Sequence, residues 1–146
     1  MTQPSPQPSP GPAAQPFAGV PAPDELTADD KLWGMLAYLI FPLLIGAIIA
    51  LVTRSASKFV KFHALQMIFL AIAVFLIYFA LWIVLLVFMF IPGINVIMAI
   101  LMIPIYGLLC LAFLGAIIYL ALKANSGLIV RLPVIGDLAY KNAYGA

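Results

Sequence analysis

Charged side chains are scarce in this sequence and are absent from its middle. Only 8% of the 146 residues are Asp, Glu, Lys or Arg, against about a quarter in an ordinary soluble domain. None of the four occurs between Lys61 and Lys123, and 66% of the chain is hydrophobic. A soluble fold of this length has too little interior volume for so much apolar surface. The composition therefore predicts a small all-α protein that crosses a lipid bilayer more than once.

Residues that carry chemistry are also few. Cys110 is the one cysteine and His63 the one histidine, so neither an internal disulfide nor a cluster of histidine or cysteine metal ligands can form. Asp and Glu occur only near the two ends of the chain, outside the apolar runs. The runs therefore lack the ionisable groups that mark proton pumps and ion-coupled transporters. We expect no enzyme, no cofactor and no metal site, and the net charge of +2 is too small to indicate nucleic-acid binding.

The first part of the chain has no apolar core. Eight of the twelve prolines lie in Met1–Pro23, and no Lys or Arg precedes Lys31. This pattern excludes a secretory signal peptide. It predicts a disordered Pro-rich tail over residues 1–26, which serves as a spacer or presents PxxP ligands. Thr27 and Asp30 then have the spacing of a capping box, so Thr27 is the predicted N-cap of a helix.

Residues 27–146 form the predicted membrane domain. It has three expected spans, at about 32–52, 64–91 and 96–122, each long enough to cross about 30 Å of hydrocarbon. We expect Pro42 to kink the first span and the uncharged turn at Pro92, Gly93 and Asn95 to join the other two. Small residues in the spans predict close helix packing: Gly46, Ala50, Gly107, Ala112, Gly115 and Ala116.

The segment 123–146 is too short and too polar to cross the bilayer. Gly127 and Pro133 interrupt it, and apolar residues stand beside Arg131 and Lys141. It is therefore predicted to lie in the membrane interface and to end in a short helix from about Gly136.

With three spans, six of the seven basic residues share one side of the membrane. The exception is Lys31. The positive-inside rule then predicts a protein of the cytoplasmic membrane with its N-terminus outside and its C-terminus in the cytoplasm.

Seven residues on the predicted cytoplasmic side are candidates for contact with anionic lipid headgroups or with a partner. His63 and Gln66 share one helix face, and they either bind such a ligand or hydrogen-bond the neighbouring loop. We also expect the C-terminal segment to lie against this loop, with Asp137 opposite its cations. The candidates are Arg54, Lys58, Lys61, His63, Gln66, Arg131 and Asp137.

Two segments resemble the signature of a known family. Residues 57–66 read Ser-Lys-Phe-Val-Lys-Phe-His-Ala-Leu-Gln, and Lys-Ala-Asn-Ser-Gly at 123–127 precedes Arg-Leu-Pro-Val-Ile-Gly-Asp at 131–137. In this order they resemble a bacterial and archaeal membrane family of unknown function. That family is distantly similar to the twenty-kilodalton subunit of the chloroplast inner-envelope import translocon. The resemblance implies a multi-pass fold, with matching positions at Lys61, His63, Gln66, Gly127, Pro133 and Gly136. The chloroplast relatives have four spans and a proposed role in preprotein translocation.

The sequence therefore favours an integral membrane protein that acts as a structural or interaction subunit of a membrane assembly, one that handles proteins or lipids. The expected partners are the lipid bilayer and either another membrane protein or further copies of the chain. The alternative is a small transporter or channel. It would have to be built by oligomerisation, because three uncharged helices enclose no polar path.

Overall fold

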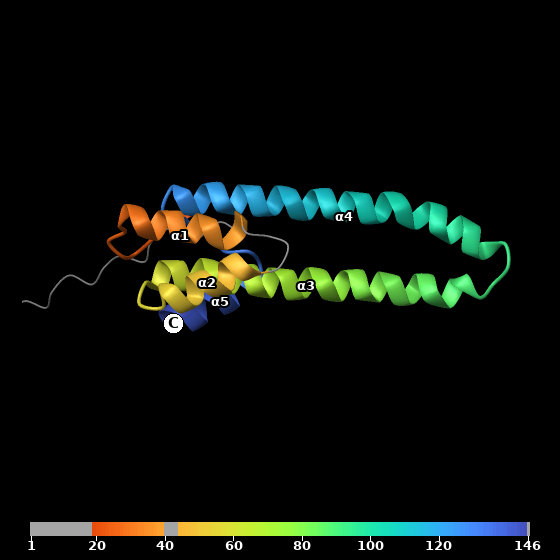
Figure 1. The fold of residues 1–146 in the computed structure, drawn as a ribbon, viewed down its shortest axis with the longest axis horizontal. Helices are drawn as coiled ribbons and strands as arrows, with labels where there is room; N and C mark the ends of the chain where they lie inside the picture. The colour runs from red at the N-terminus through yellow and green to blue at the C-terminus, as the bar shows by residue number, and fades with distance from the viewer. Residues whose placement is uncertain (1–18, 40–43, 146) are drawn as a thin grey trace, which may run out of the picture.

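The computed structural model describes residues 19–39 and 44–145. Two long helices form an antiparallel hairpin, and shorter elements pack around one end of it (Figure 1). In chain order the elements are β1 (Val20–Pro21), α1 (Ala28–Leu39), α2 (Ile45–Thr53), α3 (Lys58–Met89), α4 (Ile94–Asn125), β2 (Leu128–Ile129) and α5 (Ile135–Tyr144).

The helices α3 and α4 are both long enough and apolar enough to cross a membrane. Each has 32 residues and is therefore about 48 Å long at 1.5 Å per residue. Ser57 caps α3, its hydroxyl accepting from the backbone N–H of Val60 at 3.5 Å, so α3 begins about two turns before the predicted span. The predicted turn between the two helices is confirmed. Gly93 there has φ 87°, which favours glycine.

The predicted first span, 32–52, is not a single helix in the structure. Thr27 and Asp30 do form the capping box, with reciprocal backbone-to-side-chain bonds of 3.1 Å, but α1 ends at Leu39. The following helix, α2, runs back antiparallel to α1 (Figure 1). The predicted kink at Pro42 lies outside the described residues.

An ion pair closes this α1–α2 hairpin. Arg54, just after α2, donates from Nη2 to Oδ2 of Asp29 in the first turn of α1, at 2.8 Å. In one continuous helix these two residues would stand about 38 Å apart. The segment therefore enters and leaves at the same end of the molecule. The described residues contain two membrane-length helices, where three were predicted.

The two described ends of the chain meet in space, whereas the prediction placed the termini on opposite sides of the membrane. The strand β1 precedes α1 and β2 follows α4, yet they pair antiparallel, with Val20 opposite Ile129. Most of the predicted disordered tail lies outside the described residues. Its last part does not, and Val20 and Pro21 are held in this small sheet.

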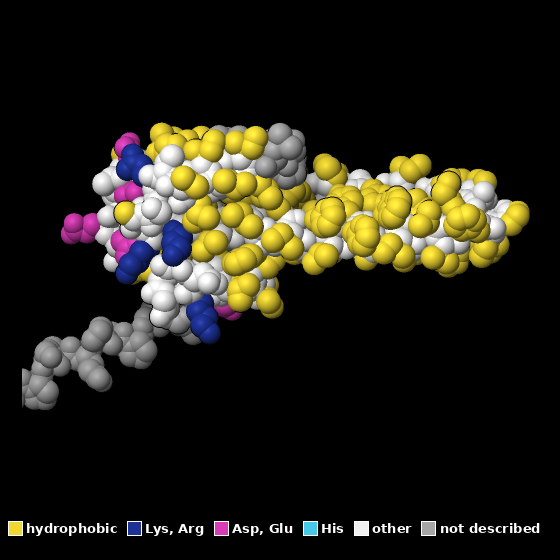
Figure 2. Space-filling view, turned by 60° about the horizontal axis from the view of Figure 1, so that its bottom comes forward, with side chains coloured by type: hydrophobic (Ala, Val, Ile, Leu, Met, Phe, Trp, Pro, Cys, Tyr) yellow, Lys and Arg dark blue, Asp and Glu magenta, His cyan; other side chains and the backbone are white. Residues whose placement is uncertain are grey.

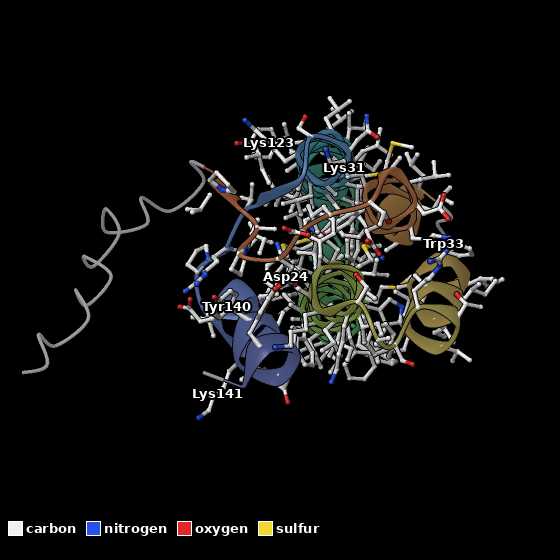
Figure 3. All side chains as sticks on the ribbon, turned by 90° about the vertical axis from the view of Figure 1, so that its left-hand side faces the viewer. Asp24, Lys31, Trp33, Lys123, Tyr140 and Lys141 are labelled. Atoms are coloured by element: carbon white, nitrogen blue, oxygen red, sulfur yellow. The ribbon has the colours of Figure 1, made fainter. Side chains whose placement is uncertain are left out.

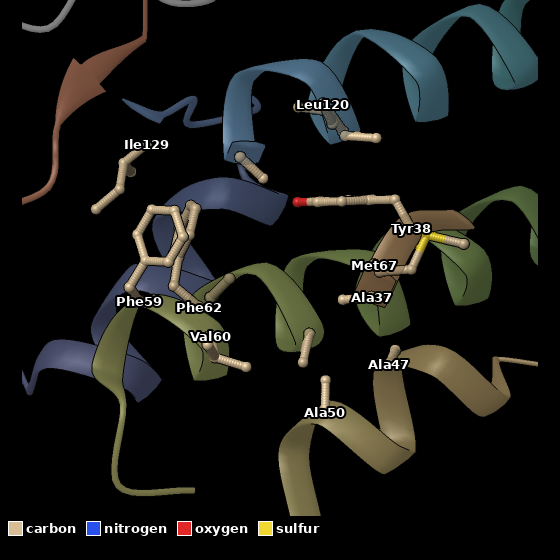
Figure 4. Close-up of a cluster of buried hydrophobic side chains, with 14 of the residues drawn as sticks. Ala37, Tyr38, Ala47, Ala50, Phe59, Val60, Phe62, Met67, Leu120 and Ile129 are labelled. Carbon is tan, nitrogen blue, oxygen red and sulfur yellow. The ribbon is translucent and has the colours of Figure 1, made fainter. Parts of the chain in front are cut away.

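Small residues allow α1 and α2 to approach α3 closely. Ala47 and Ala50 of α2 are fully buried, as the pattern around Gly46 predicted, and Figure 4 shows them facing α3. Gly34 of α1 lies so near Phe59 that a Cβ would stand 2.8 Å from that ring. Gly107 and Gly115 do not follow the prediction, because a Cβ at either would meet nothing within 4 Å.

The C-terminal segment packs on the start of α3, as the sequence led us to expect. Its helix α5 begins at Ile135, close to the predicted Gly136. Gly136 is constrained by space, since a Cβ there would stand 2.6 Å from the Cα of Arg131. Phe62 of α3 and Tyr140 of α5 make an edge-on ring contact with centroids 6.1 Å apart.

We predict that cysteines placed at Asp29 and Arg54, in a chain with Cys110 replaced by Ser, are joined efficiently in membranes by a short bifunctional maleimide. The reason is that the hairpin brings the two positions within the length of the arginine side chain that joins them in the ion pair. The measurement is the mobility shift of the cross-linked protein after cleavage between the two sites. A matched pair at Asp29 and Asn95 should not cross-link. If the Asp29 and Arg54 pair does not cross-link while the protein remains folded, the prediction of one continuous first span would be favoured instead.

Candidate functional site

The charged residues gather at one end of the molecule. All of them are among the described residues, and they lie before or early in α1, around the α2–α3 loop, or at and after the end of α4. Figure 2 shows this charged end beside a long surface that is almost wholly hydrophobic. Figure 3 looks along the molecule from the same end, where Asp24, Lys31 and Lys123 come from three different segments.

A hollow of about 620 Å³ opens at the charged end. It contains both signs of charge. The acidic residues Asp24, Glu25 and Asp30 come from the segment before α1 and from its first turn, and the basic residues Arg54 and Lys58 come from the end of α2 and the start of α3. Two hydroxyl residues complete its polar lining. The residues that line the hollow are Asp24, Glu25, Leu26, Asp30, Thr53, Arg54, Ala56, Ser57 and Lys58.

Asp30 is charged in this environment. Burial alone would raise the pKa of its carboxyl group. Hydrogen bonds from Thr27 and Ser57, together with the charge of Arg54, outweigh this effect and hold the pKa of Asp30 below its ordinary value. The hollow therefore presents the Asp30 carboxylate beside the basic residues Arg54 and Lys58. With acidic and basic side chains in one lining, it suits a zwitterionic or mixed-charge surface better than a purely anionic one.

Below the hollow, His63 and Gln66 are completely buried. The ring of His63 stands between those of Phe59 and Phe62, with centroids 4.4 and 5.0 Å away. The hydroxyl of Tyr38, from α1, lies 3.0 Å from Nδ1 of His63. Tyr38 thus links α1 to α3 through a hydrogen bond inside the apolar core.

Three polar atoms of this buried cluster lack a hydrogen bond among the residues that the structure describes. They are Nε2 of His63 and both amide atoms of Gln66. The backbone of Leu128 approaches the histidine ring, but Nε2 makes no bond of good geometry. An unpaired buried polar group costs about 1–3 kcal/mol. Neither side chain bonds the basic loop, and neither is open to a lipid headgroup.

The remaining predicted residues do not converge on one point. Arg131 lies over the ring of Tyr140, with its guanidinium carbon 3.5 Å from the ring centre. Lys61 is half-buried and Asp137 is exposed. Asp137 forms no ion pair with the loop cations among the described residues, and Arg54 pairs with Asp29 instead. The predicted salt bridge at this interface is therefore wrong, although the packing of the two segments is right.

Sequence reasoning missed the acidic half of the hollow and also Tyr38. Both omissions follow from predicting one continuous first span, which placed Asp24, Glu25 and Asp30 on the far side of the membrane and kept Tyr38 away from His63. One signal could have shown the error. Acidic residues precede the apolar segment and basic residues follow it, with Phe41 and Pro42 near its middle. This pattern also suits a helical hairpin whose two ends are joined by an ion pair.

Comparison with known proteins identifies the family. Residues 29–139 match the model of the magnetosome magnetite crystal formation protein family, MamF/MmsF. The chain belongs to this family. The MamF/MmsF match runs from the first turn of α1 to the first half of α5. It includes the buried cluster and the part of the hollow from Asp30 onward, whereas Asp24, Glu25 and Leu26 of the hollow precede it.

A relative of this MamF/MmsF chain occurs in an archaeon. The UPF0132 membrane protein of Archaeoglobus fulgidus is 36% identical over 116 residues, which cover 80% of this chain and 97% of the relative. No solved structure matches. The predicted resemblance to a bacterial and archaeal membrane family of unknown function is thus confirmed. The similarity to the chloroplast translocon subunit stays a prediction.

The buried cluster gives a test by substitution. We predict that Gln66→Met keeps or raises the melting temperature of the detergent-solubilised protein, because it removes two unpaired amide atoms at similar volume. Tyr38→Phe should lower stability by about 1–3 kcal/mol, because Nδ1 of His63 loses its bond. Met67→Leu, at another buried α3 position, is the control and should have little effect. A marked loss of stability in Gln66→Met would show that the amide has a partner in the folded protein.

Proposed function

We propose that this chain is a non-enzymatic structural protein of a membrane assembly, which anchors through α3 and α4 and presents the charged end to partners. The observation that carries the proposal is the separation of charge from the long part of the α3–α4 hairpin between Lys61 and Lys123, which contains no charged residue. The residues at the charged end form a shaped surface of both signs. Such a surface fits the recognition of another protein, because complementary charge sets orientation and specificity.

No feature of the described residues supports a reaction. No group of three or more His, Cys, Asp or Glu among them could hold a metal ion. The one buried histidine is enclosed by aromatic rings and is bonded to Tyr38. The family description concerns magnetite crystal formation in magnetosomes. A structural role at a membrane surface fits that description without any catalytic step.

The charge distribution also supports an orientation. All seven Lys and Arg residues belong to the charged end. The positive-inside rule therefore favours a location in the cytoplasmic membrane with the charged end, and both described ends of the chain, in the cytoplasm. Lys58 and Lys141 are exposed there and can contact anionic headgroups, each with a contribution of about 1 kcal/mol.

This orientation predicts which positions react from which side. In a chain with Cys110 replaced by Ser, Glu25→Cys and Ser126→Cys should both react with an impermeant maleimide from the cytoplasmic side of membrane vesicles. Asn95→Cys, in the distal turn, should react only from the opposite side. Labelling of Glu25→Cys and Ser126→Cys from different sides would contradict the two-span arrangement.

The functional proposal predicts where partners bind. A photo-cross-linking residue at Lys58 or Lys141 should give protein adducts in native membranes, whereas the same residue at the exposed distal positions Phe90 or Ile97 should give lipid adducts. Adducts are resolved by mass spectrometry. Protein adducts that form only at the distal positions would contradict the proposal.

The rival function is an oligomeric transporter or channel. The distal half of the molecule offers two apolar helices and no polar path among the described residues. Purified protein in liposomes should therefore pass no ions or small solutes. Solute flux that depends on the purified protein alone would establish the rival.

A further inference from the structure

The number of helices changes along the axis of the molecule. At the charged end, α1, α2 and α5 surround α3 and α4, whereas beyond the α1–α2 hairpin only α3 and α4 remain (Figures 1 and 3). Burial follows the same division. The buried residues of α3 end at Met67, and four of the five in α4 lie in its last third, from Ile117 onward.

The α1–α2 hairpin presents an apolar surface to its surroundings. The outward side chains of α2 are aliphatic almost to the charged loop, with Ile48 51% and Val52 73% exposed. Leu39 of α1 is also exposed. Side chains of this kind are stable in hydrocarbon and costly in water. The hairpin therefore lies in the lipid, with its open end at the headgroups.

The hairpin is too short to reach the other leaflet. The 12 residues of α1 rise about 18 Å and the nine of α2 about 14 Å, against a hydrocarbon core of about 30 Å. With the charged end held at one surface, the end of α1 at Leu39 and the start of α2 at Ile45 lie near the middle of the bilayer. Each helix with its side chains is about 10 Å across. The leaflet that holds α1 and α2 beside α3 and α4 thus contains about twice the protein cross-section of the other leaflet.

From this asymmetry we propose that the protein is a membrane wedge, which prefers and stabilises bilayers that are convex on the side of the charged end. An insertion confined to one leaflet expands that leaflet relative to the other, and bending toward it relieves the difference. The partner is the lipid bilayer itself, in its highly curved form. The wedge goes beyond the proposed structural role and does not depend on any protein partner.

The test is competition between vesicle sizes. Purified full-length protein is reconstituted into a mixture of small sonicated and large extruded vesicles of the same phosphatidylcholine and phosphatidylglycerol composition, which are then separated by size. We expect several-fold more protein per lipid in the small vesicles. In the chain with Cys110→Ser and Ser126→Cys, the fraction open to an external impermeant maleimide should be larger in the small vesicles, because the wide end favours the outer leaflet.

Two double variants test whether the preference for small vesicles comes from the α1–α2 hairpin. Ile48 and Val52 are one turn apart on the exposed face of α2, so substitution there leaves the core intact. The polar pair Ile48→Ser and Val52→Ser should lose most of the size preference with an unchanged melting temperature. The conservative pair Ile48→Val and Val52→Ile should keep the preference.

Two results would overturn the wedge. The first is equal protein density in small and large vesicles. If copies then also cross-link efficiently through Cys110, which is exposed on α4, a second copy fills the narrow half. The second is an unchanged preference in the polar pair, which would remove the hairpin as its source.

Discussion

The close approach of α1 and α2 to α3 is the constraint on which the rest of the structure depends. Lipid is as apolar as a leucine side chain, so helices in a membrane gain little from hiding apolar surface and are held together mainly by tight packing. Here Ala47 and Ala50 supply that packing from α2, and Gly34 makes room for Phe59. Without this fit, the apolar α1–α2 segment has no reason to turn back instead of crossing. The position of the charged groups, the hollow and the reversal of the chain between α1 and α2 all follow from it.

The sequence identifies the apolar elements but not the path of the first one. The runs that become α3 and α4 are unmistakable, because no charged residue interrupts them. The capping box at Thr27 and the turn at Gly93 also follow from local chemistry. The hydropathy of residues 32–52, by contrast, is the same whether the segment crosses or reverses. The reversal is decided by packing against α3 and by an exposed ion pair worth about 0–1 kcal/mol, and neither is visible in a hydropathy pattern.

The candidate site, too, could be predicted from the sequence only in part. The three-residue spacing of His63 and Gln66 correctly places them on one helix face, yet their complete burial depends on α1 and on the C-terminal segment. Tyr38 is 25 positions from His63 in sequence, so only the folded hairpin shows that they meet. The acids Asp24 and Asp30 join Arg54 for the same reason. Charge and spacing indicated which residues matter at the membrane surface, but the tertiary fold decides which of them are neighbours.

The turn between α3 and α4 has a consequence for how the chain enters the membrane. It contains Pro92 and Gly93, with Asn95 in the first turn of α4, and no charged residue, and the nearest charges on either side are Lys61 and Lys123. Moving a charge across the bilayer exchanges about 2.3 kcal/mol per 100 mV with the membrane potential. On the proposed topology the α3–α4 hairpin carries no charge across, so the electric field would do no work on its insertion. We therefore expect this hairpin to insert to the same extent in energised and in de-energised membranes.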